Sequence, residues 1–86
     1  MYAVKICVKN SNKILKGIAN IGFRTTFNQK KILLEVHILN FSGNLYNKVL
    51  TIDFICFLRN ENKFKNINQL RKQISSDLVM AKKKLN

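Results

Sequence analysis

The stretch Leu34-Glu35-Val36-His37-Ile38 sets the fold class, because apolar and polar side chains alternate along it. Alternation with a period of two is typical of a β-strand with one buried face. Leu34, Val36 and Ile38 share one face of the expected strand, so Glu35 and His37 share the other. An acid and an imidazole therefore lie side by side on the polar face.

Similar segments precede and follow this stretch, so we expect four strands within about residues 2–57, at residues 2–9, 14–21, 34–38 and 50–56. Polar and turn-forming residues lie between them, which predicts loops at residues 10–13, 23–31 and 41–47. The alternation predicts one buried face on the first strand and one on the fourth, made respectively of Tyr2, Val4, Ile6 and Val8, and of Leu50, Ile52, Phe54 and Cys56. Gly22 lacks a Cβ atom, which allows a bulge or a close backbone approach there.

The C-terminal residues change to a helical period. Apolar residues recur at spacings of three and four, which predicts one packed stripe of a helix over about residues 67–84, made of Ile67, Leu70, Ile74, Leu78, Ala81 and Leu85. Asn66 is a suitable N-cap, and Gln69 completes a capping-box spacing. Lys82 to Lys84 place positive charge at the negative end of the helix dipole. We therefore expect a mainly β single domain over residues 1–86, a small antiparallel barrel or half-barrel crossed by one helix.

Composition limits the function classes. The chain has 86 residues, 16 basic and 4 acidic, with a net charge of +12, which raises nucleic-acid binding as one hypothesis. The lysines are spread along the chain, however, and 13 Lys, 12 Asn and 10 Ile indicate a genome rich in A and T rather than a phosphate-binding patch. The longest apolar run, residues 54–58, is far too short to span a membrane, so we expect a cytoplasmic protein without membrane contact.

Few residues suggest chemistry on their own. Cys7, Cys56 and His37 are too few for a usual structural zinc site, and both cysteines are expected to be buried free thiols. Neither a GxxxxGK[ST] nor a GxGxxG phosphate-binding motif occurs. Glu35 is the acid of interest, because a carboxylate in mid-strand needs a partner or a function. An ion pair with a lysine or with His37 is the structural alternative.

Five blocks of sequence, in order, resemble the riboflavin kinase module of bacterial bifunctional riboflavin kinase/FAD synthetase. Its pattern reads roughly G-V-A-N-I-G-x-R-P-T-F, L-E-V-H, D-F-x-G-D-L-Y-G, L-R-x-E-x-x-F and Q-I-x-x-D. The matching blocks here cover residues 17–27, 34–37, 40–46, 58–64 and 73–77. The resemblance spans nearly the whole chain.

The resemblance implies a six-stranded antiparallel barrel closed by a C-terminal helix, and transfer of the γ-phosphate of ATP to the 5′-hydroxyl of riboflavin, which gives FMN. Glu35 matches the catalytic glutamate of the family, which acts as general base. The residues that match nucleotide-binding positions are Ile38, Asn40 and Tyr46. Those that match flavin-binding positions are Arg59, Asn62 and Phe64.

Departures from the family pattern define the alternatives. Tyr2 to Val4 match a strand in mid-module, so the segment that holds Mg²⁺ and the ATP phosphates is expected upstream of Met1, and no metal ligand is assigned within this chain. The expected barrel is therefore partial, with exposed strand edges. Asn47 replaces a turn glycine and is expected to adopt positive φ. The chain is either a segment that works with a complementing upstream fragment or an inactive flavin-binding remnant, and nucleic-acid binding is the third alternative.

Overall fold

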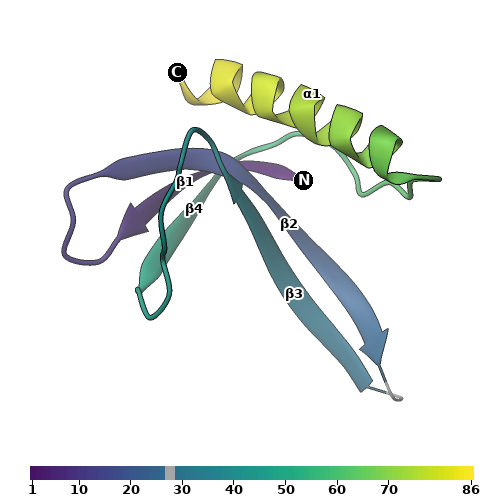
Figure 1. Cartoon of the computed structure of the whole chain (residues 1–86), viewed down its shortest axis with the longest axis horizontal. Coiled ribbons are helices and arrows are strands. Elements are labelled where there is room, and N and C mark those ends of the chain that lie inside the picture. The colour runs from purple at the N-terminus through teal and green to yellow at the C-terminus, as the bar shows by residue number, and fades with distance from the viewer. Residues whose placement is uncertain (27–28) are drawn as a thin grey trace.

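A computed structural model describes residues 1–26 and 29–86, except for the side chains of residues 24–26. It contains β1 (Tyr2–Val8), β2 (Ile14–Thr26), β3 (Gln29–Ile38), β4 (Leu50–Phe57) and α1 (Ile67–Leu85), as Figure 1 shows. The mainly β fold with one C-terminal helix is thus confirmed.

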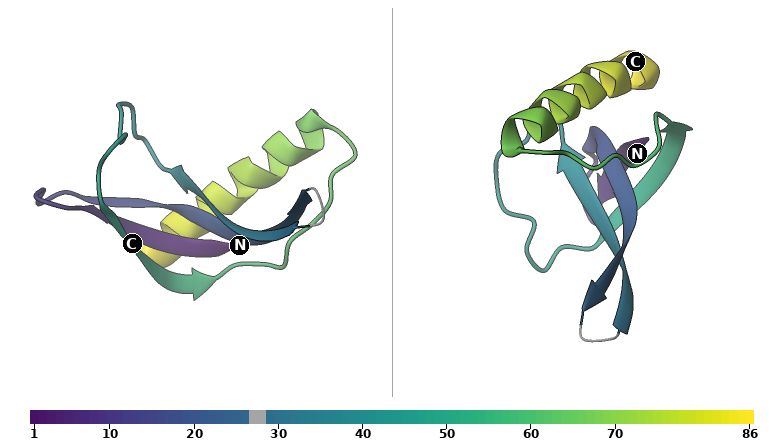
Figure 2. Two further views of the ribbon diagram at one scale, coloured as in Figure 1. Left: turned by 90° about the horizontal axis from the view of Figure 1, so that it is seen from below. Right: turned by 90° about the vertical axis from the view of Figure 1, so that its right-hand side faces the viewer.

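The strands form one sheet in the order β3-β2-β1-β4, with antiparallel pairing throughout. β3 and β4 are the outer strands, and they do not pair with each other among the residues that the structure describes. The sheet is strongly curved but open, and α1 lies across one side of it (Figures 1 and 2). This arrangement agrees with the expected partial barrel.

The loop predicted at residues 23–31 is mostly strand. β2 continues to Thr26 and β3 begins at Gln29, with Phe23 opposite Ile32 and Thr26 opposite Gln29. Phe, Thr and Ile favour pleated strands, and partners this close in sequence pair at little cost in chain entropy. These preferences outweigh the polar composition of the segment. The remainder of the predicted loop, residues 27–28, lies outside the described residues.

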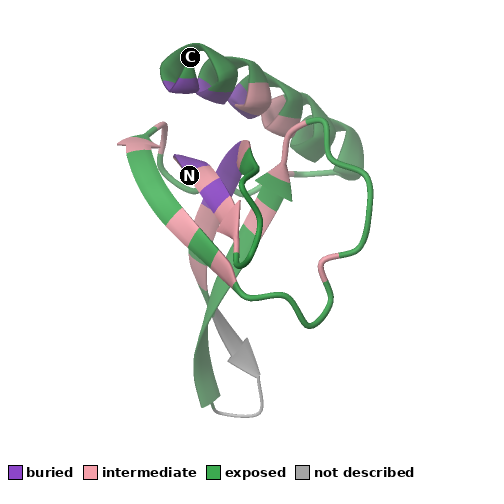
Figure 3. Ribbon diagram, turned by 90° about the vertical axis from the view of Figure 1, so that its left-hand side faces the viewer, coloured by how far each residue is buried: buried purple, intermediate pink, exposed green. Residues whose placement is uncertain are grey.

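Both faces of β1 are buried, although the sequence predicted only one. Ala3 and Val4 are adjacent and point to opposite faces, and both are completely inaccessible to solvent. The cluster beneath α1 contains Ala3, Ile18, Ala81 and Leu85. The cluster on the other face contains Val4, Ile6 and Ala19. The helix covers one face and the curvature of the sheet shields the other, so the core lies on both sides of β1 and β2 (Figure 3).

The predicted grouping of Phe54 with Cys56 is wrong. The register between β1 and β4 shifts after Ala3, which pairs with Cys56, whereas Val4 pairs with Phe54. A bulge of this kind turns later side chains to the other face. Phe54 accordingly packs edge-on against Tyr2, with ring centroids 5.2 Å apart, while Cys56 packs against the cluster beneath α1. Cys7 and Cys56 are free but half-buried rather than fully buried.

The helix begins as predicted and packs mainly through its C-terminal half. Asn66 accepts a hydrogen bond from the Gln69 amide at 2.9 Å, and the Gln69 side chain accepts one from the Lys65 amide at 3.1 Å. The second bond reaches one residue before the N-cap, and so differs from the expected capping box. Ala81 and Leu85 are buried, whereas Leu70 is 39% exposed. The N-terminal half of α1 thus projects beyond the packed part of the sheet.

Of the two glycines on β2, Gly17 is the one that the pairing with β3 requires, not Gly22. A Cβ atom at Gly17 would lie 2.2 Å from the backbone oxygen of His37 on β3, and one at Gly22 would meet nothing closer than 3.4 Å. At Gly17 the clash is with backbone, so the two strands themselves would have to separate. Asn47 adopts φ 60°, as predicted from the glycine that it replaces.

We expect Gly17→Ala to lower the free energy of unfolding by about 2 kcal/mol or more, in the range of overpacking mutations in cores. Gly22→Ala is the matched control, because it adds the same methyl group to the same strand without a clash; its effect should stay within about 0.5 kcal/mol. Urea unfolding followed by circular dichroism measures both. Equal effects of the two substitutions would contradict this account of Gly17.

Candidate functional site

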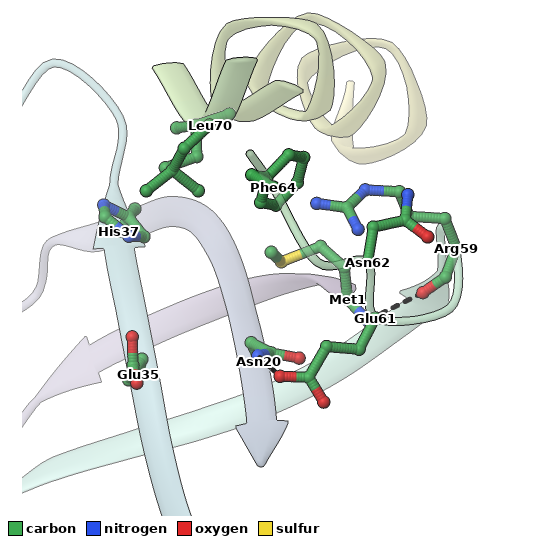
Figure 4. Close-up of a pocket in the computed structure, with 10 residues that line it drawn as sticks. Met1, Asn20, Glu35, His37, Arg59, Glu61, Asn62, Phe64 and Leu70 are labelled. Carbon is green, nitrogen blue, oxygen red and sulfur yellow. Dashed lines mark hydrogen bonds between the residues drawn. The ribbon is translucent and has the colours of Figure 1, made fainter. Parts of the chain in front are cut away.

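A cavity of about 380 Å³ lies between the N-terminal half of α1, the adjacent face of β2 and β3, and the segment that joins β4 to α1. This volume is within the range of small-molecule sites. Its lining combines carboxylate, imidazole, guanidinium, amide and apolar groups (Figure 4), contributed by Met1, Asn20, Glu35, His37, Arg59, Glu61, Asn62, Phe64, Leu70 and Ile74. Leu70 and Ile74 belong to the N-terminal half of α1, so this half of the helix forms the roof of the cavity.

The pairing of β2 with β3 brings Glu35 and His37 to the cavity. Glu35 lies opposite Asn20, and His37 lies opposite Ile18, on the face that α1 covers. Val36 belongs to the other face, where it packs against the second core cluster. The prediction that Glu35 and His37 share a face is therefore confirmed, and the shared face is the one that lines the cavity.

The segment after β4 closes the opposite side of the cavity. The Leu58 amide donates to the Met1 carbonyl at 2.9 Å, and the Met1 amino group donates to the Arg59 carbonyl at 2.8 Å. Glu61 Oε1 accepts a hydrogen bond from the side-chain Nδ2 of Asn20 at 3.3 Å, which links this segment to β2. Burial, and then the Arg59 charge, lower the pKa of the Met1 amino group. These hydrogen bonds hold the segment after β4 against Met1 and β2, so that its side chains face those of β2 and β3 across the cavity.

Arg59 is anchored to the helix by Asp77. The two Asp77 oxygens accept hydrogen bonds from Arg59 Nε and Nη2 at 2.7 and 2.6 Å, and Gln73 Nε2 donates to Asp77 at 3.0 Å. Burial raises the pKa of the Asp77 carboxyl, but the Arg59 and Gln73 hydrogen bonds and the Arg59 charge outweigh burial, so this pKa lies below its ordinary value. The hydrogen bonds from Arg59 and Gln73 favour the ionised carboxylate.

This pairing predicts acid sensitivity. A carboxyl group with a depressed pKa in the folded state stabilises the protein above its unfolded pKa, about 3.9 for Asp, and the stabilisation is lost as the pH falls through the folded value. The free energy of unfolding should therefore fall between about pH 5 and pH 2. Asp77→Asn should reduce this slope, measured by urea unfolding at each pH, whereas Asp53→Asn, an exposed carboxylate on β4, should leave it in place. An unchanged slope in Asp77→Asn would contradict the prediction.

Acidic groups are concentrated at this site. The chain has only four carboxylate side chains against sixteen basic ones. Glu35 and Glu61 line the cavity, and Asp77 binds a residue that lines it. Only Asp53 lies elsewhere, on β4. Three of the four carboxylates of a chain of net charge +12 therefore lie in or beside the cavity.

The structure separates the predicted site residues into two groups. Four of them line the cavity described above, namely Glu35, Arg59, Asn62 and Phe64. Ile38 packs on the opposite face of the sheet, Asn40 lies just after β3 with φ 51°, and Tyr46 is 84% exposed in the following loop. The three residues predicted to bind nucleotide thus lie outside the cavity. Sequence reasoning gave no role to Asn20, Glu61 or Asp77, although all three belong to matching blocks.

Neither a metal-holding cluster nor a membrane-spanning helix is found among the residues that the structure describes. Within the described residues, no group of three or more His, Cys, Asp or Glu side chains is placed to hold a metal ion. No helix among those residues is long and apolar enough to cross a membrane.

The structure is thus a β module, an open antiparallel sheet with one helix over a cavity of small-molecule size that is lined by an acid, an imidazole, an arginine and an aromatic ring. A sequence model of the riboflavin kinase family, described as Flavokinase, matches residues 1–85. The chain belongs to the riboflavin kinase family.

Three relatives of this chain are longer proteins. The bifunctional riboflavin kinase/FMN adenylyltransferase of Haemophilus influenzae is 43% identical over 82 residues, which are 95% of this chain and 26% of that protein. The protein of the same name from Buchnera aphidicola subsp. Schizaphis graminum is 40% identical over all of this chain and 28% of its own length. That of Escherichia coli is 34% identical, over 95% of this chain and 26% of its own. The chain thus spans about a quarter of the length of these relatives.

One solved structure has a similar fold. The crystal structure of a macrolide-efflux protein from Streptococcus pneumoniae superposes with a TM-score of 0.78, over 88% of this chain and 24% of that chain, at 24% sequence identity. At this identity the likeness concerns the fold alone.

Proposed function

We propose that this chain is the flavin-binding and catalytic part of a riboflavin kinase, which transfers the γ-phosphate of ATP to the 5′-hydroxyl of riboflavin and yields FMN and ADP. The observation that supports this proposal most directly is the common cavity of Glu35, Arg59, Asn62 and Phe64. A proton acceptor, a planar cation, an amide and an aromatic ring in one space match the needs of a flavin with a reactive hydroxyl.

Glu35 acts in this proposal as the general base. The 5′-hydroxyl oxygen of riboflavin attacks the γ-phosphorus of ATP, the bond from that phosphorus to the bridging oxygen of ADP breaks, and the hydroxyl proton passes to the Glu35 carboxylate. Phosphoryl transfer depends mostly on positioning and charge stabilisation, so it requires only one well-placed general base to accept the hydroxyl proton. Phe64 and Arg59 provide flat surfaces for the isoalloxazine, and Asn62 provides hydrogen-bonding groups.

The nucleotide belongs outside this cavity. We propose that Ile38, Asn40 and Tyr46 contact ATP from the end of β3 and the loop that follows it. Mg²⁺ accompanies ATP in such reactions and neutralises developing phosphate charge. No group of three or more His, Cys, Asp or Glu side chains among the described residues is placed to hold a metal ion, and we assign no ligand of Mg²⁺ to these residues. The need for ATP places the reaction in the cytoplasm.

A complementing segment is the further partner that we propose. The face of the sheet opposite α1 carries large apolar side chains that are 43–56% exposed, namely Ile21, Leu34, Phe54 and Phe57. Both outer strands leave an edge unpaired among the described residues. Exposed apolar surface beside free strand edges is suited to further strands. The relatives are about four times as long as the matched region, which provides chain for such strands.

A chimera tests the proposal. The 82 matched residues of the Haemophilus influenzae protein would be replaced by their counterparts from this chain, and FMN formation from riboflavin and MgATP would be followed by chromatography. Turnover above that of the same relative without the matched residues supports the proposal. A folded chimera without turnover refutes it.

The second candidate function is flavin binding without turnover. The observation that favours it is that the cavity is formed by residues of this chain alone. Riboflavin fluorescence quenched by the 86-residue chain, together with an inactive chimera, would support this alternative. Quenching together with an active chimera would support the kinase.

A further inference from the structure

The Asp77 carboxylate has no part in the chemistry proposed above, yet its partners connect it to the cavity. Asp77 lies on α1 and is 2% exposed. Both of its oxygens accept hydrogen bonds from Arg59, and Gln73, one helical turn earlier, donates a third. A bidentate, charge-assisted pair of this kind fixes the plane of the guanidinium as well as its position. A carboxylate so fully occupied acts on its surroundings only through its partners.

The pattern of bonds determines which part of Arg59 is left for a ligand. A guanidinium has five N–H groups in a planar fork. Asp77 occupies the edge formed by Nε and Nη2, and the Asn60 carbonyl accepts a bond from Nη1 at 2.9 Å. The N–H groups that remain belong to Nη1 and Nη2. One N–H group on each of Nη1 and Nη2, together with the flat face of the guanidinium, is therefore left for a ligand, and Arg59 lines the cavity.

We propose that Asp77 is a positioning residue, which holds Arg59 so that the remaining N–H groups of Nη1 and Nη2 meet the hydrogen-bond acceptors of the flavin. This inference rests on the proposed function. A guanidinium that is fixed before the ligand arrives loses less side-chain freedom on binding. Asp77 thus contributes to flavin affinity without touching the flavin. Gln73 supports the same arrangement, because it occupies one further acceptor site of Asp77.

The test uses the 86-residue chain, its Asp77→Asn variant, and Asp53→Asn as a control that removes one carboxylate charge elsewhere. Titration with riboflavin, followed by fluorescence quenching, gives the affinity, and nuclear magnetic resonance of the Arg59 Nε–Hε group reports whether the guanidinium is fixed. We expect Asp77→Asn to broaden or lose the Hε signal and to weaken riboflavin binding about tenfold, and Asp53→Asn to change neither. In an Arg59→Gln background, Asp77→Asn should change the affinity less than about twofold.

Three results would overturn the proposal. Unchanged riboflavin affinity in Asp77→Asn is the first, and an equal loss in the Arg59→Gln background is the second, because Asp77 would then act through the fold. The third is an unmodified 86-residue chain in which the Arg59 Hε signal shows a fixed guanidinium but riboflavin does not bind. This result would refute the flavin site itself, so it can be distinguished from the other two. If Asp77→Asn does not fold, Gln73→Ala removes only one of the three bonds. A two- to threefold loss of affinity is then expected, and no loss overturns the proposal.

Discussion

Replacing Glu35 by Gln in the chimera is expected to lower FMN formation by about 10²- to 10⁴-fold, which is the usual contribution of a general base. Gln keeps the size of the side chain and one acceptor oxygen but cannot take the hydroxyl proton. Riboflavin binding by the 86-residue chain should change less than about threefold, because the flavin contacts that we propose lie on Arg59, Asn62 and Phe64. The effect should therefore be confined to turnover, measured under saturating riboflavin and MgATP.

The cavity provides a matched control in its second carboxylate. Glu61 lines the same space, on the opposite side, and accepts a hydrogen bond from Asn20. Glu61→Gln removes the same charge from the same cavity, and a loss of turnover at least tenfold smaller than that of Glu35→Gln is expected. If Glu61→Gln abolished turnover and Glu35→Gln did not, the result would contradict Glu35 as the general base and indicate Glu61 instead.

The sequence predicted the parts of the fold that depend on local periodicity. The alternation around Glu35 placed that residue and His37 on one face, and the spacing of apolar residues from Ile67 onward predicted the helix within one residue of its observed bounds. The N-cap at Asn66 followed from its residue type. Such features depend on neighbours a few residues away, so they can be predicted from a single sequence.

Features that depend on distant partners were missed. The shift between Ala3 and Val4 reverses the faces of Phe54 and Cys56, and no local pattern records it. The need for glycine at Gly17 arises from the approach of the His37 carbonyl, twenty residues away. The Arg59–Asp77 pair likewise joins residues eighteen positions apart on different elements. For the site, resemblance suggested Glu35, Arg59, Asn62 and Phe64, and only the structure brought them to one cavity.

Replacing Phe64 by Ala is expected to weaken riboflavin binding by the 86-residue chain by about 10- to 100-fold. Phe64 is half-buried at the wall of the cavity, beside Arg59 and Asn62. Full burial of a phenylalanine ring is worth about 1.5–3 kcal/mol, of which a flavin adds only about half because Phe64 is already half-buried, and a favourable aromatic pair adds about 0.5–1.5 kcal/mol. Together these contributions correspond to about 10- to 100-fold in affinity. A flavin seated against Phe64 depends on both contributions. Fluorescence quenching at constant ionic strength gives the dissociation constants.

A second phenylalanine shows whether the effect belongs to the site. Phe23 lies on β2 and is 74% exposed, and it does not line the cavity. Phe23→Ala removes the same ring from the same chain, and riboflavin affinity should stay within about twofold of the unmodified chain, since exposed side chains away from a site contribute little. Thermal unfolding of both variants separates loss of binding from loss of fold. An affinity that is unchanged in Phe64→Ala, with the fold intact, would mean that the flavin does not rest on this ring; because Phe64 faces the same space as Glu35, such a result would also remove the main support for catalysis in this cavity.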